Sequence, residues 1–84
     1  MLELSSLDCS ILQLANESVV NLDFVIDSIK KNFNNKISKK EVINSLEELK
    51  KERLIFISDD YLEIVSIINI NFVIWNVDLN YYFS

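Results

Sequence analysis

The residues that could do chemistry are few, and their types exclude most catalytic sites. The 84-residue chain has no histidine, no glycine and one cysteine, Cys9. Neither an ordinary zinc site nor a Ser-His or Cys-His pair can be built from this set, and no glycine-rich loop can cradle a phosphate. The adjacent carboxylates Asp59 and Asp60 attract cations but are too few to enclose a metal ion. We therefore expect no enzyme activity, no metal and no cofactor, with Cys9 acting as a small core residue.

The basic residues are the strongest sign of a binding site, because all of them lie in one window. The eight are Lys30, Lys31, Lys36, Lys39, Lys40, Lys50, Lys51 and Arg53. Residues 30–53 also hold four acidic residues, so this window has a net charge of +4, whereas the remaining sixty residues hold nine acids and no base. The whole chain has a net charge of −5 and a pI near 4.5. Such a protein does not bind nucleic acid or anionic membranes indiscriminately, but one face of it can be basic.

Apolar spacing and capping residues predict three helices ahead of residue 54. The first begins at Ser5, with Asp8 in the position of a capping box. Its apolar stripe is Leu7, Ile11 and Leu14, flanked by Leu4 and Leu12. The second begins at the N-cap Asn21. Its apolar stripe is Leu22, Val25, Ile26, Ile29 and Phe33.

The third predicted helix carries most of the candidate site. Ser38 and Glu41 have the spacing of a capping box, so the helix should begin at Ser38. Its buried stripe is Val42, Leu46 and Leu49. The polar residues of the helix then face outward, and they are Lys39, Lys40, Glu41, Asn44, Glu47, Glu48 and Lys51.

After the third helix the apolar period changes from 3.6 to 2, which predicts a hairpin. We expect strands at 54–57 and 61–67, joined by a tight turn at Ser58-Asp59-Asp60, and a short strand at Val19-Val20. Alternation continues through residues 68–83 with a change of phase near Ile74-Trp75, which predicts one or two further strands. The fold class is therefore α+β, in a single domain over 1–84 with a core at 5–67 and an apolar extension at 68–84.

The run from Ser38 to Ile55 resembles the third helix and first wing strand of winged helix-turn-helix domains. It follows the pattern S-x-x-x-V-x-x-x-L-x-x-L-x-x-x-x-L-I that MarR-like and PadR-like regulators carry there. The resemblance is at superfamily level and covers residues 5–67. It implies a three-helix core with a hairpin wing. It also implies that the third helix reads the major groove of duplex DNA while the wing touches the flanking backbone.

Two features, at three residues, depart from the family pattern. Arg53 stands where glycine usually precedes the Leu-Ile pair, so the third helix must end without the residue that best adopts the left-handed conformation. Asp59 and Asp60 stand at the wing tip, where DNA-binding members carry basic residues, and two carboxylates repel phosphate.

The three predicted helices also resemble a second group of proteins, the winged-helix elements that bind leader peptides in peptide-modification systems.

Two interpretations of the third helix have equal weight. Lysine can contact guanine or phosphate, and asparagine can read adenine. The predicted DNA-binding residues are Lys36, Ser38, Lys39, Lys40, Asn44 and Lys51. Alternatively, this surface is only a solvated helix face with pairs such as Lys40–Asn44 and Glu47–Lys51. At Lys30, Lys31 and Lys36, stabilisation of the second helix's C-terminal end is the stronger interpretation.

The apolar C-terminal extension predicts a second binding surface. Half of the chain is apolar and its mean hydropathy is +0.20, which exceeds what one small core needs. Aromatic residues are enriched at interfaces, so the predicted interface residues are Phe72, Trp75, Tyr81, Tyr82 and Phe83. They would pair two copies as a homodimer or hold a protein partner. The alternative is a strand that closes over the wing.

No membrane or export signal is evident in the sequence. Residues 1–7 have no basic n-region, and the longest uncharged stretch, 64–77, is shorter than the about 20 apolar residues that span a bilayer. We therefore predict a cytoplasmic protein with no membrane partner.

The first functional hypothesis is a dimeric transcriptional regulator that binds duplex DNA. The alternative is a protein or peptide interaction module that uses the acidic wing and the aromatic C-terminal segment.

Overall fold

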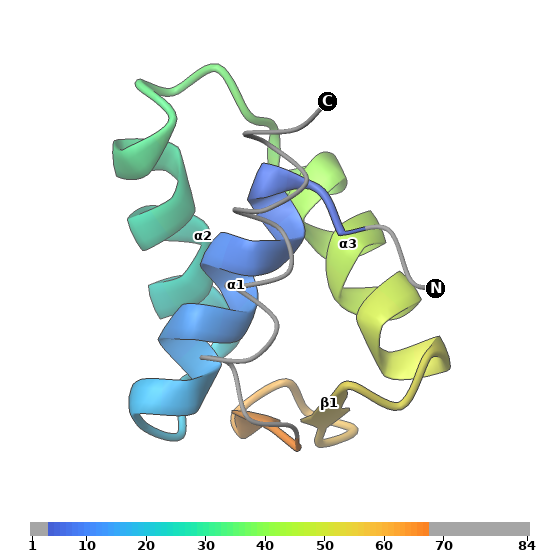
Figure 1. The fold of residues 1–84 in the computed structure, drawn as a ribbon. Helices are drawn as coiled ribbons and strands as arrows, with labels where there is room; N and C mark the ends of the chain where they lie inside the picture. Colours follow the sequence, from blue (N-terminus) through green and yellow to red (C-terminus); the bar gives the residue numbers. More distant parts are fainter. Residues whose placement is uncertain (1–3, 68–84) are drawn as a thin grey trace.

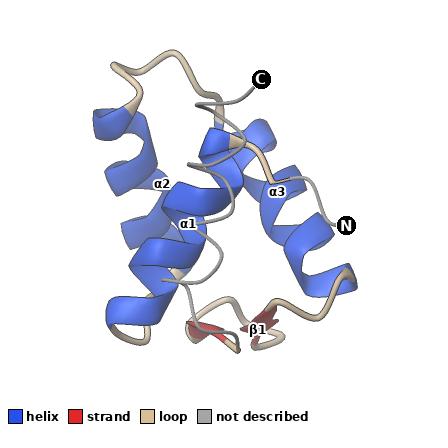
Figure 2. Ribbon diagram, viewed as in Figure 1, coloured by secondary structure: helices blue, strands red, loops and turns tan. Residues whose placement is uncertain are grey.

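The computed structural model describes residues 4–67, and the strands predicted over 68–83 lie outside that range. Three helices are followed by a two-stranded sheet. These elements are α1 (Ser6–Glu17), α2 (Leu22–Asn32), α3 (Lys39–Lys51), β1 (Ile55–Ile57) and β2 (Ile64–Ser66). Figure 1 shows the sheet at one end of the helices and the α2–α3 loop at the opposite end. The predicted α+β class is confirmed, and Figure 2 shows that helix dominates it.

All three helices begin at the predicted capping residues. The Ser5 Oγ accepts a bond of 3.1 Å from the Asp8 backbone N–H, and the Asp8 carboxylate accepts one of 3.1 Å from the Ser5 N–H. The Asn21 side chain accepts from the Phe24 N–H at 2.8 Å. At α3 the Ser38 Oγ accepts from the Glu41 N–H at 3.2 Å, but the return bond of the predicted capping box is absent there. These caps satisfy N–H groups that have no partner inside the helix.

The core is built around α1, which packs against α2, α3 and β2. The buried apolar side chains are Ile11, Leu12, Ala15, Val20, Val25, Ile26, Ile29, Val42, Leu46, Leu49, Ile55, Ile57 and Ile64. The predicted stripe of α1 is partly right: Ile11 and the flanking Leu12 are buried, but Leu7 and Leu14 are only partly so, and Ala15 is buried as well. With neighbours on several sides, α1 buries a broader surface than one stripe.

The predicted hairpin forms, with Phe56 directly opposite Val65. A third chain segment joins its edge: the Val20 N–H donates to the Ile64 carbonyl at 3.0 Å, and the Ile64 N–H donates back at 2.8 Å. The short strand predicted at Val19-Val20 is thus reduced to one bridge. The sheet ties the α1–α2 connection to the hairpin.

The returning strand is shorter than predicted, because residues 61–63 belong to the turn. The Ser58 N–H donates to the Glu63 carbonyl at 2.9 Å, and the Tyr61 N–H donates to the Ser58 carbonyl at 3.0 Å. The Asp60 side chain also accepts from the Leu62 N–H at 3.1 Å. These bonds close a loop of six residues, where the sequence had suggested a turn of three.

The chain makes its left-handed turns with residues that carry a Cβ atom. Among residues 4–67, positive φ angles occur at Asn34 (54°), Asn35 (60°), Arg53 (62°) and Tyr61 (59°). Arg53 occupies the place of the missing glycine after α3. Its N–H donates to the Lys50 carbonyl and the next N–H donates to the Leu49 carbonyl, both at 3.0 Å. This is a Schellman motif with arginine in the left-handed position.

Replacing Arg53 with glycine should stabilise the fold, since glycine adopts this φ without a Cβ clash. We expect Arg53→Gly to raise the free energy of unfolding by about 0.5–1 kcal/mol, after glycine's larger unfolded-state entropy is subtracted. The melting midpoint should rise by about 3–6 °C. Thermal and urea unfolding measure both quantities. In the control Glu48→Gly, glycine lies at an exposed position inside α3 and should destabilise by about 1 kcal/mol. A glycine at 53 that gives no gain would contradict this account.

Candidate nucleic-acid interface

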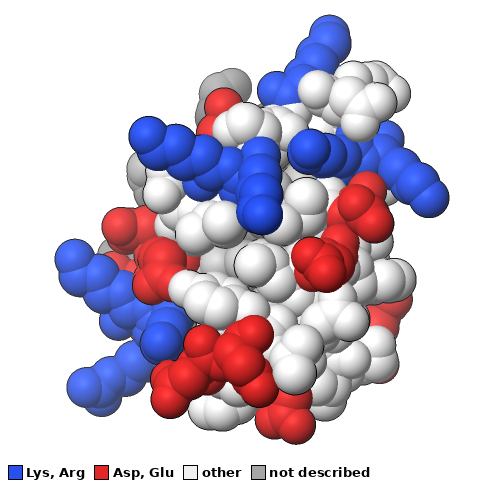
Figure 3. Space-filling model, turned by 180° about the vertical axis from the view of Figure 1, so that it is seen from behind, with Lys and Arg blue, Asp and Glu red and all other residues white. Residues whose placement is uncertain are grey.

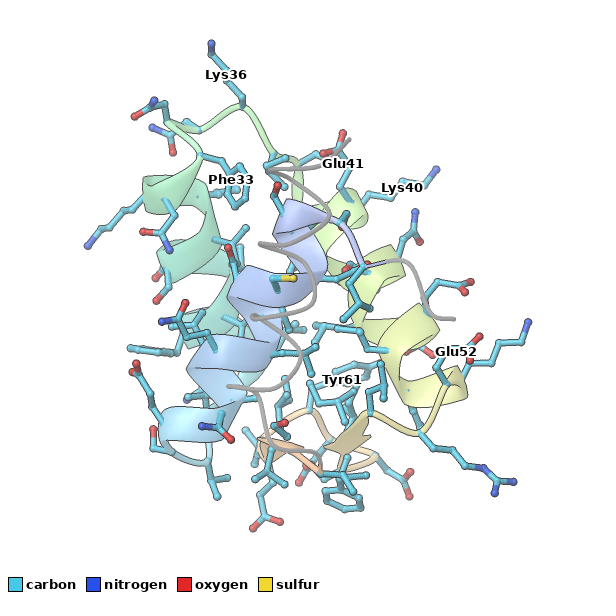
Figure 4. All side chains as sticks on the ribbon, viewed as in Figure 1. Phe33, Lys36, Lys40, Glu41, Glu52 and Tyr61 are labelled. Atoms are coloured by element: carbon cyan, nitrogen blue, oxygen red, sulfur yellow. The ribbon has the colours of Figure 1, made fainter. Side chains whose placement is uncertain are left out.

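Three of the predicted lysines lie together at the start of α3. The loop after α2 turns through two left-handed asparagines, and the Lys36 N–H then donates to the Phe33 carbonyl at 3.0 Å. The half-buried Ile37 packs against the core just before the Ser38 cap. Figure 4 shows the Lys36 and Lys40 side chains pointing outward at this end of the molecule. We call the exposed side chains Lys36, Lys39 and Lys40 the lysine end.

The outward row of α3 joins the lysine end to less basic residues. Lys40, Asn44, Glu47 and Lys51 are spaced by four, three and four residues, so they share one side of the helix. All four are exposed, and they lie opposite the buried residues of α3. Lys51 is about 16 Å from Lys40 along the axis. Lys36, Lys39, Lys40 and Asn44 therefore lie on the loop and the first two turns of α3, and Lys51 lies at the far end of the helix.

Ser38, which was predicted to contact DNA, is the N-cap residue of α3. Its Oγ caps α3, which places its hydroxyl at the helix N-terminus among backbone N–H groups. The partial positive charge of that terminus adds to the charge of the neighbouring lysines. This end of α3 therefore favours an anion.

Acidic residues lie beside the lysine end as well as away from it. Glu41 is exposed in the first turn of α3, next to Lys40, whereas Glu48 lies near the other end of the helix and Glu52 is its C-cap. Figure 3 shows basic side chains gathered over the upper part of the molecule, with some carboxylates beside them, more carboxylates at the lower edge and a second basic group at the side. Lysines therefore outnumber carboxylates at the start of α3, whereas both signs of charge occur toward the sheet.

The hairpin turn contributes two of these carboxylates. Asp59 and Asp60 are exposed at the turn. The Ser58 Oγ donates to the Asp60 Oδ1 at 2.7 Å, and this bond, together with the Leu62 N–H, lowers the pKa of Asp60. Asp60 is therefore charged at neutral pH, as the sequence led us to expect of this turn.

A contact between the turn and α3 was missed by sequence reasoning. The Tyr61 hydroxyl donates to the Glu47 Oε1 at 2.5 Å, and the Tyr61 carbonyl accepts from the Leu22 N–H at 3.0 Å. Tyr61 had been assigned to a strand, where its side chain would follow the strand's alternation. Its left-handed backbone instead lets one residue link the turn to α2 and α3. No sequence signal pointed to this link.

A second missed residue positions α3 from the inside. Ser45 is the one buried polar side chain among residues 4–67, and its Oγ donates to the Asp8 Oδ1. Asp8 also completes the capping box of α1. The same carboxylate thus holds the start of α1 and the middle of α3. Spacing along the chain cannot reveal such a pair, since 37 residues separate the partners.

The predicted interface residues and Cys9 remain to be placed. Phe72, Trp75, Tyr81, Tyr82 and Phe83, the predicted interface, lie outside the described residues. Cys9 is partly buried in α1. Over residues 4–67 no three acidic, cysteine or histidine side chains cluster as metal ligands would. Within that range, too, no helix has the length and apolar character needed to cross a membrane.

Comparison with known proteins adds no support for a function, so the proposed function depends on the geometry described above. No protein-family model, no curated protein and no solved structure matches this chain.

The Tyr61–Glu47 bond should be visible in a pH titration. The bond to the Glu47 carboxylate raises the pKa of Tyr61 above the ordinary 10.0. Its contribution to stability is therefore fully present below that ordinary value and is lost as the pH rises through the higher folded-state value. Subtracting the tyrosinate absorbance of Tyr61→Phe from that of the native chain isolates Tyr61. Glu47→Gln, which keeps an acceptor without the charge, should return the midpoint toward 10.0. Equal midpoints with and without the Glu47 charge would exclude the bond.

Proposed function

We propose that this chain is a winged-helix domain that binds duplex DNA with the first half of α3. The observation that carries the proposal is the lysine end: Lys36, Lys39 and Lys40 are exposed together around the N-terminus of an outward-facing helix. The order of three helices and a hairpin supports the fold assignment. We further propose that the protein is a cytoplasmic transcriptional regulator that acts as a dimer.

The chemistry of each residue gives it a role in this proposal. Lys36, from the loop, and Lys39, beside the Ser38 cap, neutralise backbone phosphates together with the positive end of the α3 dipole. Lys40 and Asn44 are four residues apart on the outward row, so both reach the floor of a groove that the helix enters. There asparagine pairs with adenine and lysine with guanine.

The hairpin turn limits how the helix docks. Asp59 and Asp60 repel phosphate, and Tyr61 holds the turn close to α3 through Glu47. Contact confined to the loop and the first two turns of α3 avoids this repulsion. The proposed docking therefore differs from that of the regulators the sequence resembles, in which the wing also touches the backbone.

A second candidate function is a protein or peptide interaction module without DNA binding. Its support is the acidic turn and the exposure of large apolar side chains, among them Phe24, Phe56 and Leu62. A basic, partly apolar peptide would complement such a surface. The two candidates differ in their response to duplex DNA.

Reversing the lysine end should abolish DNA binding. The native chain should bind fluorescent duplexes with a log–log salt slope of about −2, because Lys36 and Lys39 each neutralise a phosphate and so displace a counterion. Lys39→Glu/Lys40→Glu should show no measurable binding, since it places carboxylates against phosphate. Fluorescence anisotropy at several salt concentrations, on genomic and random duplexes, measures both.

The control carries the same charge change elsewhere. Lys30→Glu/Lys31→Glu alters the last turn of α2, where the lysines serve the helix dipole. We expect it to weaken binding only by about tenfold, through the general charge of the protein. Native protein without duplex affinity at low salt would refute DNA binding and leave the interaction module. An equal loss in both double variants would refute the assignment to α3.

A further inference from the structure

The outer side of the small sheet is an exposed apolar face. Phe56 lies directly opposite Val65, and the Val20–Ile64 bridge puts Val19 opposite Val65 on its other flank. Ile67 follows Val65 by two residues and so points the same way. Val19, Phe56 and Ile67 are 60%, 48% and 61% exposed, and Val65 is partly exposed. We call these four side chains the sheet face.

Opposite charges lie at the two ends of the sheet face. At the hairpin turn are the exposed carboxylates Asp59, Asp60 and Glu63. At the other end, where α3 leads into β1, Lys50, Lys51 and Arg53 are exposed with a single acid between them. The ends are about 13 Å apart along the hairpin, beyond the screening length of physiological salt. Within residues 4–67 none of these six side chains forms an ion pair.

We propose that the sheet face is a homodimer interface, in which two copies pack face to face with their hairpins antiparallel. A two-fold interface must be complementary to itself, so each contact occurs twice. An uncharged centre meets this condition. Under the two-fold rotation, the acidic turn of each copy also lies over the basic end of the other. Nucleic acid would not suit an apolar face beside carboxylates, and an uncharged protein partner would leave the charged ends unpaired.

The size of the face sets the strength of the dimer. Four partly exposed side chains fall short of the roughly 800 Å² per partner found in stable complexes, so the charged ends must contribute. We therefore expect a dissociation constant of about micromolar order that rises with salt. The lysine end lies at the opposite end of the molecule from the sheet (Figure 1), so dimer formation leaves it free. The dimer does not depend on DNA binding, and its test contains no DNA.

Sedimentation velocity of the full chain over a wide concentration range tests the apolar centre. The native chain should shift from the mass of one chain to that of two. Phe56→Lys should raise the dissociation constant at least about tenfold, since it places a charge in the centre of the interface. The matched control is Phe24→Lys. Phe24 is 50% exposed, as Phe56 is 48% exposed, but it lies on α2 and not on the sheet. This control should dimerise like the native chain, and circular dichroism confirms that each variant is folded.

A charge exchange tests the antiparallel arrangement. In Lys50→Glu/Arg53→Asp both ends become acidic, and in Asp59→Lys/Glu63→Lys both become basic, so each variant alone should dimerise at least about tenfold more weakly. Mixed together, the two variants should form a heterodimer as strong as the native dimer, because every end again faces its opposite.

Three results would overturn the proposal. A chain that stays monomeric at every concentration has no such interface, whatever covers the sheet face. Native-like dimerisation of Phe56→Lys would place any dimer contact elsewhere. A mixture that associates no better than its separate components would refute the antiparallel charge pairing.

Discussion

Burial of α1 is the constraint on which the rest of the structure depends. Ile11, Leu12 and Ala15 are completely inaccessible, and α1 packs against both other helices and β2. Each of these elements packs apolar side chains against α1, so removing α1 would expose part of the core on all three of them. The Asp8 carboxylate adds direction to this packing, because it bonds Ser45 of α3 while completing the cap of α1. The outward side of α3 is set by these contacts.

The same arrangement places the lysine end and the acidic turn at opposite ends of the helices. The lysine end gathers at the α2–α3 loop, while the acidic turn lies with the sheet at the other end of the helices (Figures 1 and 3). A molecule with a net charge of −5 can therefore offer an anion-binding surface. The acidic turn repels the DNA backbone. In the proposed dimer, the same turn lies against the basic residues at the end of α3 in the second copy. The two proposals thus assign different ends of the molecule to different partners.

A chain without glycine carries local strain at its turns. Asparagine tolerates the left-handed conformation, which explains its use at residues 34 and 35. Arg53 and Tyr61 tolerate it less well, and each is held there by specific bonds: a Schellman motif at Arg53, and bonds to Leu22 and Glu47 at Tyr61. The Tyr61 conformation turns its hydroxyl toward α3. The bonds of Tyr61 to Glu47 and Leu22 therefore hold the acidic turn in place against α3 and α2.

The sequence by itself determined the three helices, their caps, most of the core and the clustering of basic residues. Capping and apolar periodicity act over three to seven residues, so Ser5, Asn21 and Ser38 could be recognised without coordinates. Only the tertiary structure decided which lysines share one end, how far Lys51 lies from them, and which apolar side chains form the sheet face. It also revealed Ser45 on Asp8 and Tyr61 on Glu47, because these partners are 37 and 14 residues apart. Such pairs depend on how the helices pack, which the sequence encodes only through the whole core.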